Sequence, residues 1–542
     1  MTRLRAFLIV ALLWAAMYLP GLGSTEIKGE EGRRILAAVT MLDEGDWLVP
    51  HVGGKPFLRK PPLVNWAIAL SFKTLNRRDE WAARLPSALC VLALCGVVIA
   101  VSGARARTMI TTDVAFVASI FAMTQCGLLA KARFAGAEIE GIYVPLAGMA
   151  VVTWLAWWEQ RRSPWLTWTV PFVFLGLAGL AKGPMHLLFF YAIVVAVLWQ
   201  AGGLAELRRG PHFVGIPIML GIVALWAVPY FQQHPEAAKV WNDQMAGRVT
   251  GNKFDAASYA LNVPRGLFDA LPWLLFAPLL WIRRAAWTGR EAALVRGTML
   301  AVAVCFFALL LVPGVLTRYV LPLGLPLALL LALAVTEEKQ TPPRDALRWW
   351  WNANAGGALG LLALAIAAPA AVAIGEQKHL RVVGERFGGM ATFIVWPILA
   401  SSSVIIICLV VFVGRKKFAR PTRLAGASAA LFGAAAMLYA AAAVPFINHA
   451  DNLRPLAATI DTAIPRGEKL YLFDIDYQPA IFYLRTPYSY VNTIKELPPE
   501  AKYVLARSGN LKKLTSERRD FELVQELEGR DKNRPSLFRG RE

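Results

Sequence analysis

Thirteen apolar segments, most of them 17 to 23 residues long, run through the first 446 residues of the chain. A helix needs about 20 apolar residues to cross a hydrocarbon core of about 30 Å, and shorter runs can cross when their ends are anchored. The sequence therefore predicts a mostly α-helical, polytopic membrane protein with about 13 transmembrane helices. The segments are 6–22, 86–102, 109–130, 141–158, 165–181, 185–201, 213–231, 268–282, 297–313, 319–336, 354–374, 391–413 and 424–446.

The composition excludes a string of soluble domains. Hydrophobic residues make up 56% and charged residues 17% of the chain, whereas soluble domains carry about 45–50% and about 25%. The formal charge of +20 comes without a basic block interleaved with aromatic residues, so we expect no nucleic-acid partner. Membrane lipids are the expected surroundings of most of the chain.

Basic residues gather in alternate loops between the apolar segments. If the N-terminus is cytoplasmic, the positive-inside rule is satisfied at every short loop, from Arg3 and Arg5 to Arg415-Lys416-Lys417. An odd number of spans then places the C-terminus on the outer face. The charge therefore predicts a multi-pass membrane protein with a cytoplasmic N-terminus and an exocytoplasmic C-terminus.

Three segments are too polar to span, and all three fall on the outer face in this topology. They are the loops 23–85 and 232–267 and the tail 447–542. The predicted domains are thus a transmembrane domain, 1–446, and an exocytoplasmic domain, 447–542. Because the spans carry almost no ionisable residues, we expect the chemistry at the outer membrane surface.

The first outer loop contains local structural signals. Residues 24–46 show helical spacing of apolar residues, and Glu30, Glu31, Arg33 and Arg34 fall on other faces. This segment predicts an amphipathic helix on the membrane, ended by Gly45. A short hairpin is predicted around Gly53-Gly54. Lys60 precedes two prolines that stiffen the backbone, which suits a fixed positive charge for a phosphate.

The tail has the alternation of a small α/β domain. We expect helices at 452–463, Gln478–Leu484 and near 508–515. We expect strands at Lys469–Asp474, Tyr488–Val491, Ala501–Ala506 and as a pair around 521–538. Asp474 and Asp476 follow a strand, and we interpret them as structural or accessory.

Short motifs recur in one order along nearly the whole chain and resemble a known family. The motifs are Glu30-Glu31-Gly32-Arg33, Gly45-Asp46-Trp47-Leu48-Val49-Pro50, Lys60-Pro61-Pro62-Leu63, Ala83-Arg84-Leu85-Pro86-Ser87, Ala132-Arg133 with Glu138, Leu180-Ala181-Lys182-Gly183-Pro184, Leu271-Pro272-Trp273, Arg318-Tyr319-Val320-Leu321-Pro322 and Tyr477-Gln478-Pro479-Ala480. On these motifs the chain resembles the bacterial aminoarabinose transferase and protein-mannosyltransferase-like family, polytopic glycosyltransferases of the GT-C fold class.

The resemblance implies two catalytic carboxylates, Glu30 and Glu138. The family has aspartate at both positions, so both residues depart from its pattern. A carboxylate beside the anomeric carbon can deprotonate a hydroxyl acceptor or orient an anionic one. The paired change suggests a subfamily with a modified site. The alternative for Glu30 is a solvated charge on an amphipathic helix, and Glu138 and Glu140 have the alternative of simple loop carboxylates.

The resemblance also implies cations for the departing phosphate. Lys60 leads, followed by Arg248 and Tyr319, with Arg318 adjacent. Accessory candidates are Glu31, Arg33, Glu140 and Lys182. Glu31 has an alternative as an ion-pair partner of Arg33 or Arg34. Lys182 has an alternative as part of a chain-reversing turn.

No cofactor or metal is expected. Some family members hold a metal between an acidic residue before the Lys-Pro-Pro motif and a histidine in the second outer loop. Here the first position is Arg59, and the second loop offers His234 and Asp243 but no histidine near Arg248. A cation at such an electropositive place is disfavoured.

The predicted function is transfer of a sugar from a polyprenyl phosphate-linked donor to an envelope acceptor on the periplasmic side. A lipid A-like glycolipid is the first choice of acceptor, with another glycan or a protein as in protein O-mannosyltransferases as the alternative. Two readings from other classes stay open. They are a transporter or flippase for a polyprenyl-linked sugar, and a non-catalytic binding protein derived from the family.

Overall fold

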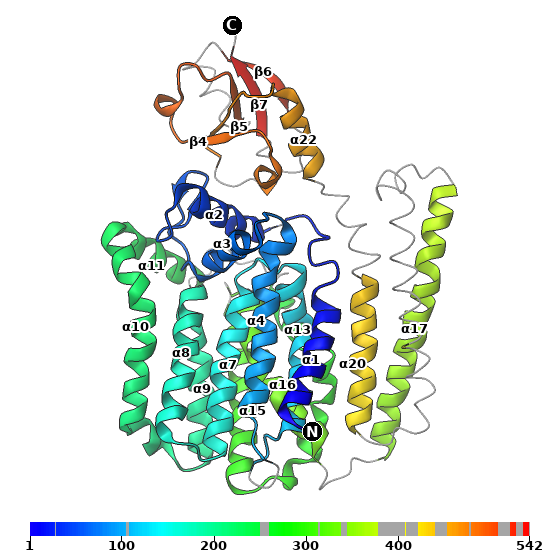
Figure 1. The fold of residues 1–542 in the computed structure, drawn as a ribbon. Coiled ribbons are helices and arrows are strands. Elements are labelled where there is room, and N and C mark those ends of the chain that lie inside the picture. Colours follow the sequence, from blue (N-terminus) through cyan, green and yellow to red (C-terminus); the bar gives the residue numbers. More distant parts are fainter. Residues whose placement is uncertain are drawn as a thin grey trace.

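A computed structural model describes residues 1–27, 29–104, 108–249, 259–312, 315–337, 344–377, 407, 421–439, 453–475, 479–507, 521–526 and 535–540. Within them the chain is mostly helical and ends in a small domain built on a β-sheet. The long helices stand side by side, and the sheet domain lies beyond one end of them (Figure 1). The N-terminus lies at the opposite end.

Five helices are long and apolar enough to cross a membrane. Two further pairs of helices qualify if each bent pair counts as one span: Thr112–Thr124 with Cys126–Phe134, bent by 57°, and Asn262–Asp269 with Trp273–Ile282, bent by 85°. The described residues thus contain five to seven candidate spans of a polytopic membrane protein. The five are α4 (Glu80–Ala100), α7 (Glu140–Glu159), α8 (Pro164–Lys182), α10 (Gly210–Gln233) and α15 (Gly289–Leu310).

Other helices fill most of the remaining predicted segments. These are α1 (Arg3–Tyr18), α9 (Met185–Gln200), α16 (Gly324–Thr336), α17 (Arg344–Gln377) and α20 (Pro421–Leu438). The predicted segment 391–413 lies, apart from residue 407, outside the described residues. The shorter elements are α5 (Thr112–Thr124), α6 (Cys126–Leu129), η1 (Ala130–Phe134), η2 (Leu204–Arg208), α13 (Asn262–Asp269), η3 (Trp273–Phe276), α14 (Pro278–Ile282), η4 (Arg284–Ala286), η5 (Thr317–Tyr319) and η6 (Leu321–Leu323).

Helix α7 forms the centre of the bundle. It is apolar on every face, as expected of a helix surrounded by others, and 94% of its most apolar window is buried. It packs against α4 and α8. At Gly148 a side chain would collide with Leu325 of α16, so the glycine permits that close approach. The residues at the start of this fixed helix therefore have a well-defined position.

The first outer loop folds into α2 (Glu31–Glu44), a hairpin and α3 (Leu63–Leu75). The hairpin pairs β1 (His51–Val52) with β2 (Lys55–Pro56), as predicted around Gly53-Gly54. Gly45 ends α2 in the left-handed conformation, also as predicted.

The predicted start of the first helix at residue 24 is wrong, because the described residues before Glu30 form turns and bends. The carbonyl oxygens of Leu22, Thr25 and Glu26 accept hydrogen bonds from the buried Arg84. Those oxygens are consequently engaged by a side chain from α4 rather than by a helical turn.

The second outer loop contributes α11 (Glu236–Val249) at the same end of the bundle as α2 (Figure 1). The indole of Trp241 in α11 donates a hydrogen bond of 2.7 Å to the carbonyl of Leu58. Trp226 of α10 bonds in the same way to Leu48 at 3.0 Å. The two outer loops therefore contact each other just before Lys60.

The C-terminal domain has a five-stranded mixed sheet in the order β4-β3-β5-β7-β6. Strands β4, β3 and β5 run parallel, and β7 and β6 join antiparallel. The predicted α/β pattern is confirmed at the described elements, while 508–515 lies outside them. The elements are α22 (Arg454–Ala463), β3 (Leu470–Phe473), η8 (Pro479–Tyr483), β4 (Tyr488–Val491), η9 (Ile494–Glu496), β5 (Tyr503–Arg507), β6 (Phe521–Glu526) and β7 (Pro535–Gly540).

Candidate active site

The ends of several helices meet around a charged cleft with about 350 Å³ of empty space, open solvent included. It lies where α2, the start of α3, the start of α7, the end of α8 and η5 converge. Residues as far apart in the sequence as Glu30 and Tyr319 therefore line the same cleft. The cleft is lined by Glu30, Arg34, Lys60, Glu138, Ile139, Glu140, Lys182, Arg318 and Tyr319.

Glu30 is the residue before the first turn of α2. A carboxylate is favourable there because the helix dipole is positive at its N-terminus. Its side chain is 42% exposed and lies 3.1 Å from the Arg33 guanidinium. Glu30 is thus the carboxylate of the cleft that an incoming molecule meets most readily. Arg33 is its ion-pair partner and does not line the cleft.

Glu138 and Glu140 stand at the start of α7 and each pairs with cations. The ammonium of Lys131 lies 2.6 Å from Glu138, and that of Lys182 lies 2.9 Å from Glu140. Arg318 lies between the two carboxylates, 3.9 Å from Glu138 and 3.6 Å from Glu140. Neither carboxylate is therefore the solvated loop residue that the alternative interpretation required.

Burial raises the pKa of Glu138, while the hydrogen bond from Lys131 opposes that rise. The net upward shift means that the carboxyl takes up a proton at a higher pH than an ordinary glutamate. A glutamate of this kind can exchange a proton closer to neutrality, which is a property of general acids and bases.

Lys60 and Tyr319 line the cleft from the first outer loop and from η5. Lys60 directly precedes Pro61 and Pro62, after which α3 begins. The ammonium of Lys182 lies 4.5 Å from the centre of the Tyr319 ring, a cation–π contact. Gly183 follows Lys182 with φ of 111°, so the turn predicted there is present. Lys182 also lines the cleft.

The remaining predicted residues lie elsewhere. Arg248 is in α11, and its side chain lies outside the described residues. Glu31 does not line the cleft, and the alternative that paired it with Arg33 or Arg34 is wrong, because its partner is Arg84. Asp474 pairs with Lys55 of the hairpin at 2.8 Å, and Asp476 lies outside the described residues.

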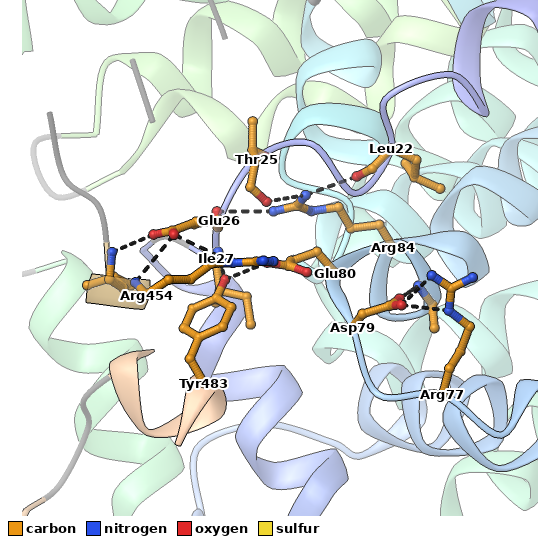
Figure 2. Close-up of polar contacts among 12 residues, drawn as sticks. Leu22, Thr25, Glu26, Ile27, Arg77, Asp79, Glu80, Arg84, Arg454 and Tyr483 are labelled. Atoms are coloured by element: carbon orange, nitrogen blue, oxygen red, sulfur yellow. Dashed lines mark hydrogen bonds and ion pairs between the residues drawn. The ribbon is translucent and has the colours of Figure 1, made fainter. Parts of the chain in front are cut away.

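Arg84 fixes the loop that carries Glu30. Its side chain is fully buried and forms two hydrogen bonds of 2.9 Å to the Glu31 carboxylate. The carbonyls of Leu22, Thr25 and Glu26 accept its other hydrogen bonds (Figure 2). We call this arrangement of Arg84 and Glu31 the arginine clamp.

The arginine clamp also reaches the second catalytic candidate. The Glu31 carboxylate accepts a hydrogen bond of 3.0 Å from the backbone N–H of Ala137. Glu31 follows Glu30, and Ala137 precedes Glu138. A side chain at Gly136 would collide with Arg84, so this glycine permits the close approach. The clamp therefore ties together the two loops that present Glu30 and Glu138.

The C-terminal domain is attached to the same region (Figure 2). Glu26 accepts hydrogen bonds from the backbone N–H groups of Leu453 and Arg454 at the start of α22. The Arg454 guanidinium and the Tyr483 hydroxyl both donate to Glu80 at 2.7 Å. The domain is thus held by charged contacts beside the clamp.

The described residues do not fit a metal site of the kind known in the family. Arg59, which holds the position of an acidic ligand, is exposed and positively charged. Within the described ranges there is no group of three histidine, cysteine, aspartate or glutamate residues that could hold a metal ion. We therefore derive no step through a metal.

Two arginines escaped prediction from the sequence. Arg34 lines the cleft although the helical pattern placed it on a polar face. Arg84 was part of a recognised motif, but the sequence alone assigned it no partner. Arg84 lay in the predicted outer loop 23–85, just before the apolar segment 86–102, so no sequence pattern indicated its burial inside α4.

Comparisons with known proteins show related sequences and a related fold. The family described as dolichyl-phosphate-mannose-protein mannosyltransferase matches residues 59–228. An undecaprenyl phosphate-alpha-4-amino-4-deoxy-L-arabinose arabinosyl transferase of Pseudomonas savastanoi pv. phaseolicola is 25% identical over 66% of this chain and 66% of its own length. The enzyme of the same name from Aeromonas salmonicida is 24% identical over 68% of this chain and 67% of its own. The chain thus spans about two thirds of these relatives.

A solved structure extends the likeness to the whole chain. ArnT from Cupriavidus metallidurans bound to undecaprenyl phosphate superposes with a TM-score of 0.70. The sequence identity is 16%, and the match covers 99% of this chain and 97% of that one. The likeness includes the C-terminal sheet domain, since nearly all of both chains is covered. The chain is thus ArnT-like: it resembles these arabinosyl transferases in sequence over about two thirds of its length and shares the fold of ArnT along nearly all of it.

Proposed function

We propose that the protein transfers a sugar from a polyprenyl phosphate-linked donor to an acceptor at the outer face of the membrane. The observation that carries the proposal is the cleft itself, where Glu30 and Glu138 meet Lys60, Arg318 and neighbouring cations. Relatives are named for transfer of aminoarabinose from undecaprenyl phosphate. A donor of this kind, ending in a phosphate-linked sugar, suits a mixed cleft of carboxylates and cations.

The proposed chemistry needs charge stabilisation on the leaving side. The bond between the anomeric carbon and the phosphate oxygen breaks, and its electron pair stays on the phosphate. Fixed cations beside that oxygen lower the barrier because negative charge develops there. We assign this role to Lys60 and Arg318, with the Tyr319 hydroxyl as a neutral hydrogen-bond donor, and propose that Arg248 joins them from the second outer loop. Lys182 and Glu140 act as accessories by holding Arg318 and Tyr319 in place.

Glu30 is proposed to act on the acceptor. A hydroxyl acceptor forms its bond to the anomeric carbon as its proton passes to the Glu30 carboxylate. A phosphate acceptor carries no proton to be removed, so there the carboxylate orients it. Glu138, buried and bonded to Lys131, assists by holding Lys131 and Arg318 in place. The extra methylene of each glutamate, relative to the aspartate of the family pattern, sets the carboxylates further from their backbones.

A lipid A-like glycolipid is our first choice of acceptor because relatives act with an aminoarabinose donor, and a protein acceptor is the alternative. The proposed topology has 13 spans, a cytoplasmic N-terminus and a periplasmic C-terminal domain in a bacterial inner membrane. Helix α1, with 16 residues, reaches about 24 Å at 1.5 Å per residue. It therefore needs anchored ends to cross, and Arg3 and Arg5 supply one anchor.

Reconstitution in vesicles tests the proposal. Full-length protein receives undecaprenyl phosphate-linked aminoarabinose labelled in the sugar, with a lipid A-like glycolipid or a membrane protein fraction as acceptor. Covalent label in either acceptor supports transfer and identifies the acceptor class. Label that crosses the bilayer without becoming covalent overturns transfer in favour of transport.

Variants assign the roles. Glu30→Gln should abolish transfer to a hydroxyl acceptor while leaving donor binding nearly intact. The matched control is Glu44→Gln, an exposed glutamate at the other end of α2. Lys60→Met should weaken donor binding, with Lys73→Met, at an exposed position of α3, as its control. Full turnover in Glu30→Gln would contradict its role as a base.

A further inference from the structure

Arg34 is a buried arginine in the wall of the cleft, one helical turn after Glu30. Its side chain is only 3% exposed, and it lines the cleft together with Lys60 and Tyr319. The ring of Phe57 lies 4.9 Å from the centre of its guanidinium. A buried charged group at this place requires an explanation, because burial of a charge is costly unless it is paired.

Two nitrogens of this guanidinium lack a hydrogen-bond partner. Within the part of the chain that the structure describes, neither Nε nor Nη1 of Arg34 has one. Arg84, which is also fully buried, shows the contrasting case, since it donates to Glu31 and to three backbone carbonyls. Arg84 is thus a structural residue, whereas Arg34 has two N–H donors without an acceptor in the described part of the chain.

The carboxylates of the cleft do not supply the missing partner. Glu30 pairs with Arg33, Glu138 with Lys131 and Glu140 with Lys182. Burial lowers the pKa of Arg34 to about 10, and Glu30 and Glu140 oppose the shift, so the guanidinium remains protonated at neutral pH. A permanent cation with two buried, unpartnered donors in the wall of a cleft fits an anion with several oxygens.

We propose that Arg34 binds a phosphate group of the substrate through its Nε and Nη1. The inference rests on the proposed function and extends it, because neither the family motifs nor the sequence assigned this residue to the site. The phosphate has two possible sources, the polyprenyl phosphate of the donor or a phosphate on a glycolipid acceptor. A planar guanidinium offers two parallel donors to either one.

Binding measurements on the full chain in nanodiscs test the proposal. The probes are undecaprenyl phosphate, undecaprenol and a bisphosphorylated lipid A. The variants are Arg34→Gln and Arg34→Lys, with Arg78→Gln as control, because Arg78 is 46% exposed and pairs with Asp43 away from the cleft. Charge-assisted hydrogen bonds contribute about 1.5–3 kcal/mol, so Arg34→Gln should weaken binding of the relevant phosphate about 10-fold to 150-fold.

The pattern across probes identifies the source. Loss confined to undecaprenyl phosphate supports the donor, and loss confined to lipid A supports the acceptor. Arg34→Lys should retain part of the affinity, since it keeps the charge. Undecaprenol should bind the variants and the unmodified protein equally. Equal weakening for undecaprenol would overturn the proposal, because it would show a packing effect rather than phosphate recognition.

Thermal stability without ligand separates this role from a structural one. Removing a buried, incompletely bonded charge should leave the melting temperature of Arg34→Gln unchanged or higher, whereas the stabilisation by added ligand should shrink. A lower melting temperature together with unchanged phosphate affinity would overturn the inference for Arg34 alone. Failure of the unmodified protein to bind undecaprenyl phosphate would instead overturn the proposed function.

Discussion

Replacement of Arg84 by methionine should be among the most destabilising single changes in the outer loop. Arg84→Met removes two bonds of 2.9 Å to Glu31 and leaves that carboxylate, 2% exposed, without its counter-ion. Breaking a buried ion pair from one side costs about 3–5 kcal/mol. The carbonyls of Leu22, Thr25 and Glu26 lose a donor as well.

Titration with SDS in mixed micelles gives the free energy of unfolding needed for this test. Arg78→Met is the matched control because its pair with Asp43 is exposed at both side chains, and such pairs contribute about 1 kcal/mol or less. In the double variant Arg84→Met/Glu31→Gln, the neutral amide can still accept the bond from Ala137. The double variant should therefore lose less unfolding free energy than the sum of the losses in Arg84→Met and Glu31→Gln, by about 0.5–3 kcal/mol.

Activity provides a second readout of the arginine clamp. Because Glu31 joins the Glu30 loop to Ala137 beside Glu138, Arg84→Lys should lower kcat more than it raises KM for the donor. A displacement of about 1 Å in a reacting group can cost about 100-fold in rate. The account fails if Arg84→Met is no less stable than Arg78→Met, or if the double variant loses the full sum.

Three further predictions follow from particular contacts. Burial raises the pKa of Glu138 in the folded state, so the free energy of unfolding should fall as pH rises through that raised pKa. Glu138→Gln should flatten this part of the pH profile of the unfolding free energy, and an unchanged profile would contradict the shift. Gly54→Ala should lose about 1–3 kcal/mol more than Gly45→Ala in the same unfolding titration, since both have positive φ but only at Gly54 does a Cβ meet Tyr490, at 2.6 Å; equal losses would exclude this contact. Tyr483→Phe removes the hydroxyl that bonds Ile27 and Glu80 and should increase hydrogen exchange at the start of α22, whereas unchanged exchange would show that these bonds do not hold the domain.

The sequence predicted the parts of this molecule that depend on local pattern. Apolar run length located the helices, and the hairpin at Gly53-Gly54 and the cap at Gly45 follow from glycine's freedom at positive φ. The strand pattern of the tail was equally local. The start of α2 was mispredicted because its boundary depends on Arg84, which lies 53 residues from its partner Glu31.

The site was predictable only as a set of residues, not as an arrangement. Family motifs singled out Glu30, Lys60, Glu138 and Tyr319, which line one cleft in the structure. Arg34 looked like a solvated charge on a helix because periodicity cannot show that η5 and the start of α7 cover that face. Glu31 looked like a surface partner of its neighbours for the same reason.

Transfer of labelled sugar by the reconstituted full-length protein tests the central claim most directly. With undecaprenyl phosphate-linked aminoarabinose as donor and a lipid A-like glycolipid or membrane protein as acceptor, we expect covalent label in the acceptor, lost in Glu30→Gln for a hydroxyl acceptor and kept in Glu44→Gln. Bound donor that never yields labelled acceptor, including when aspartate is restored at positions 30 and 138, would contradict the assignment of this cleft as a glycosyltransferase active site.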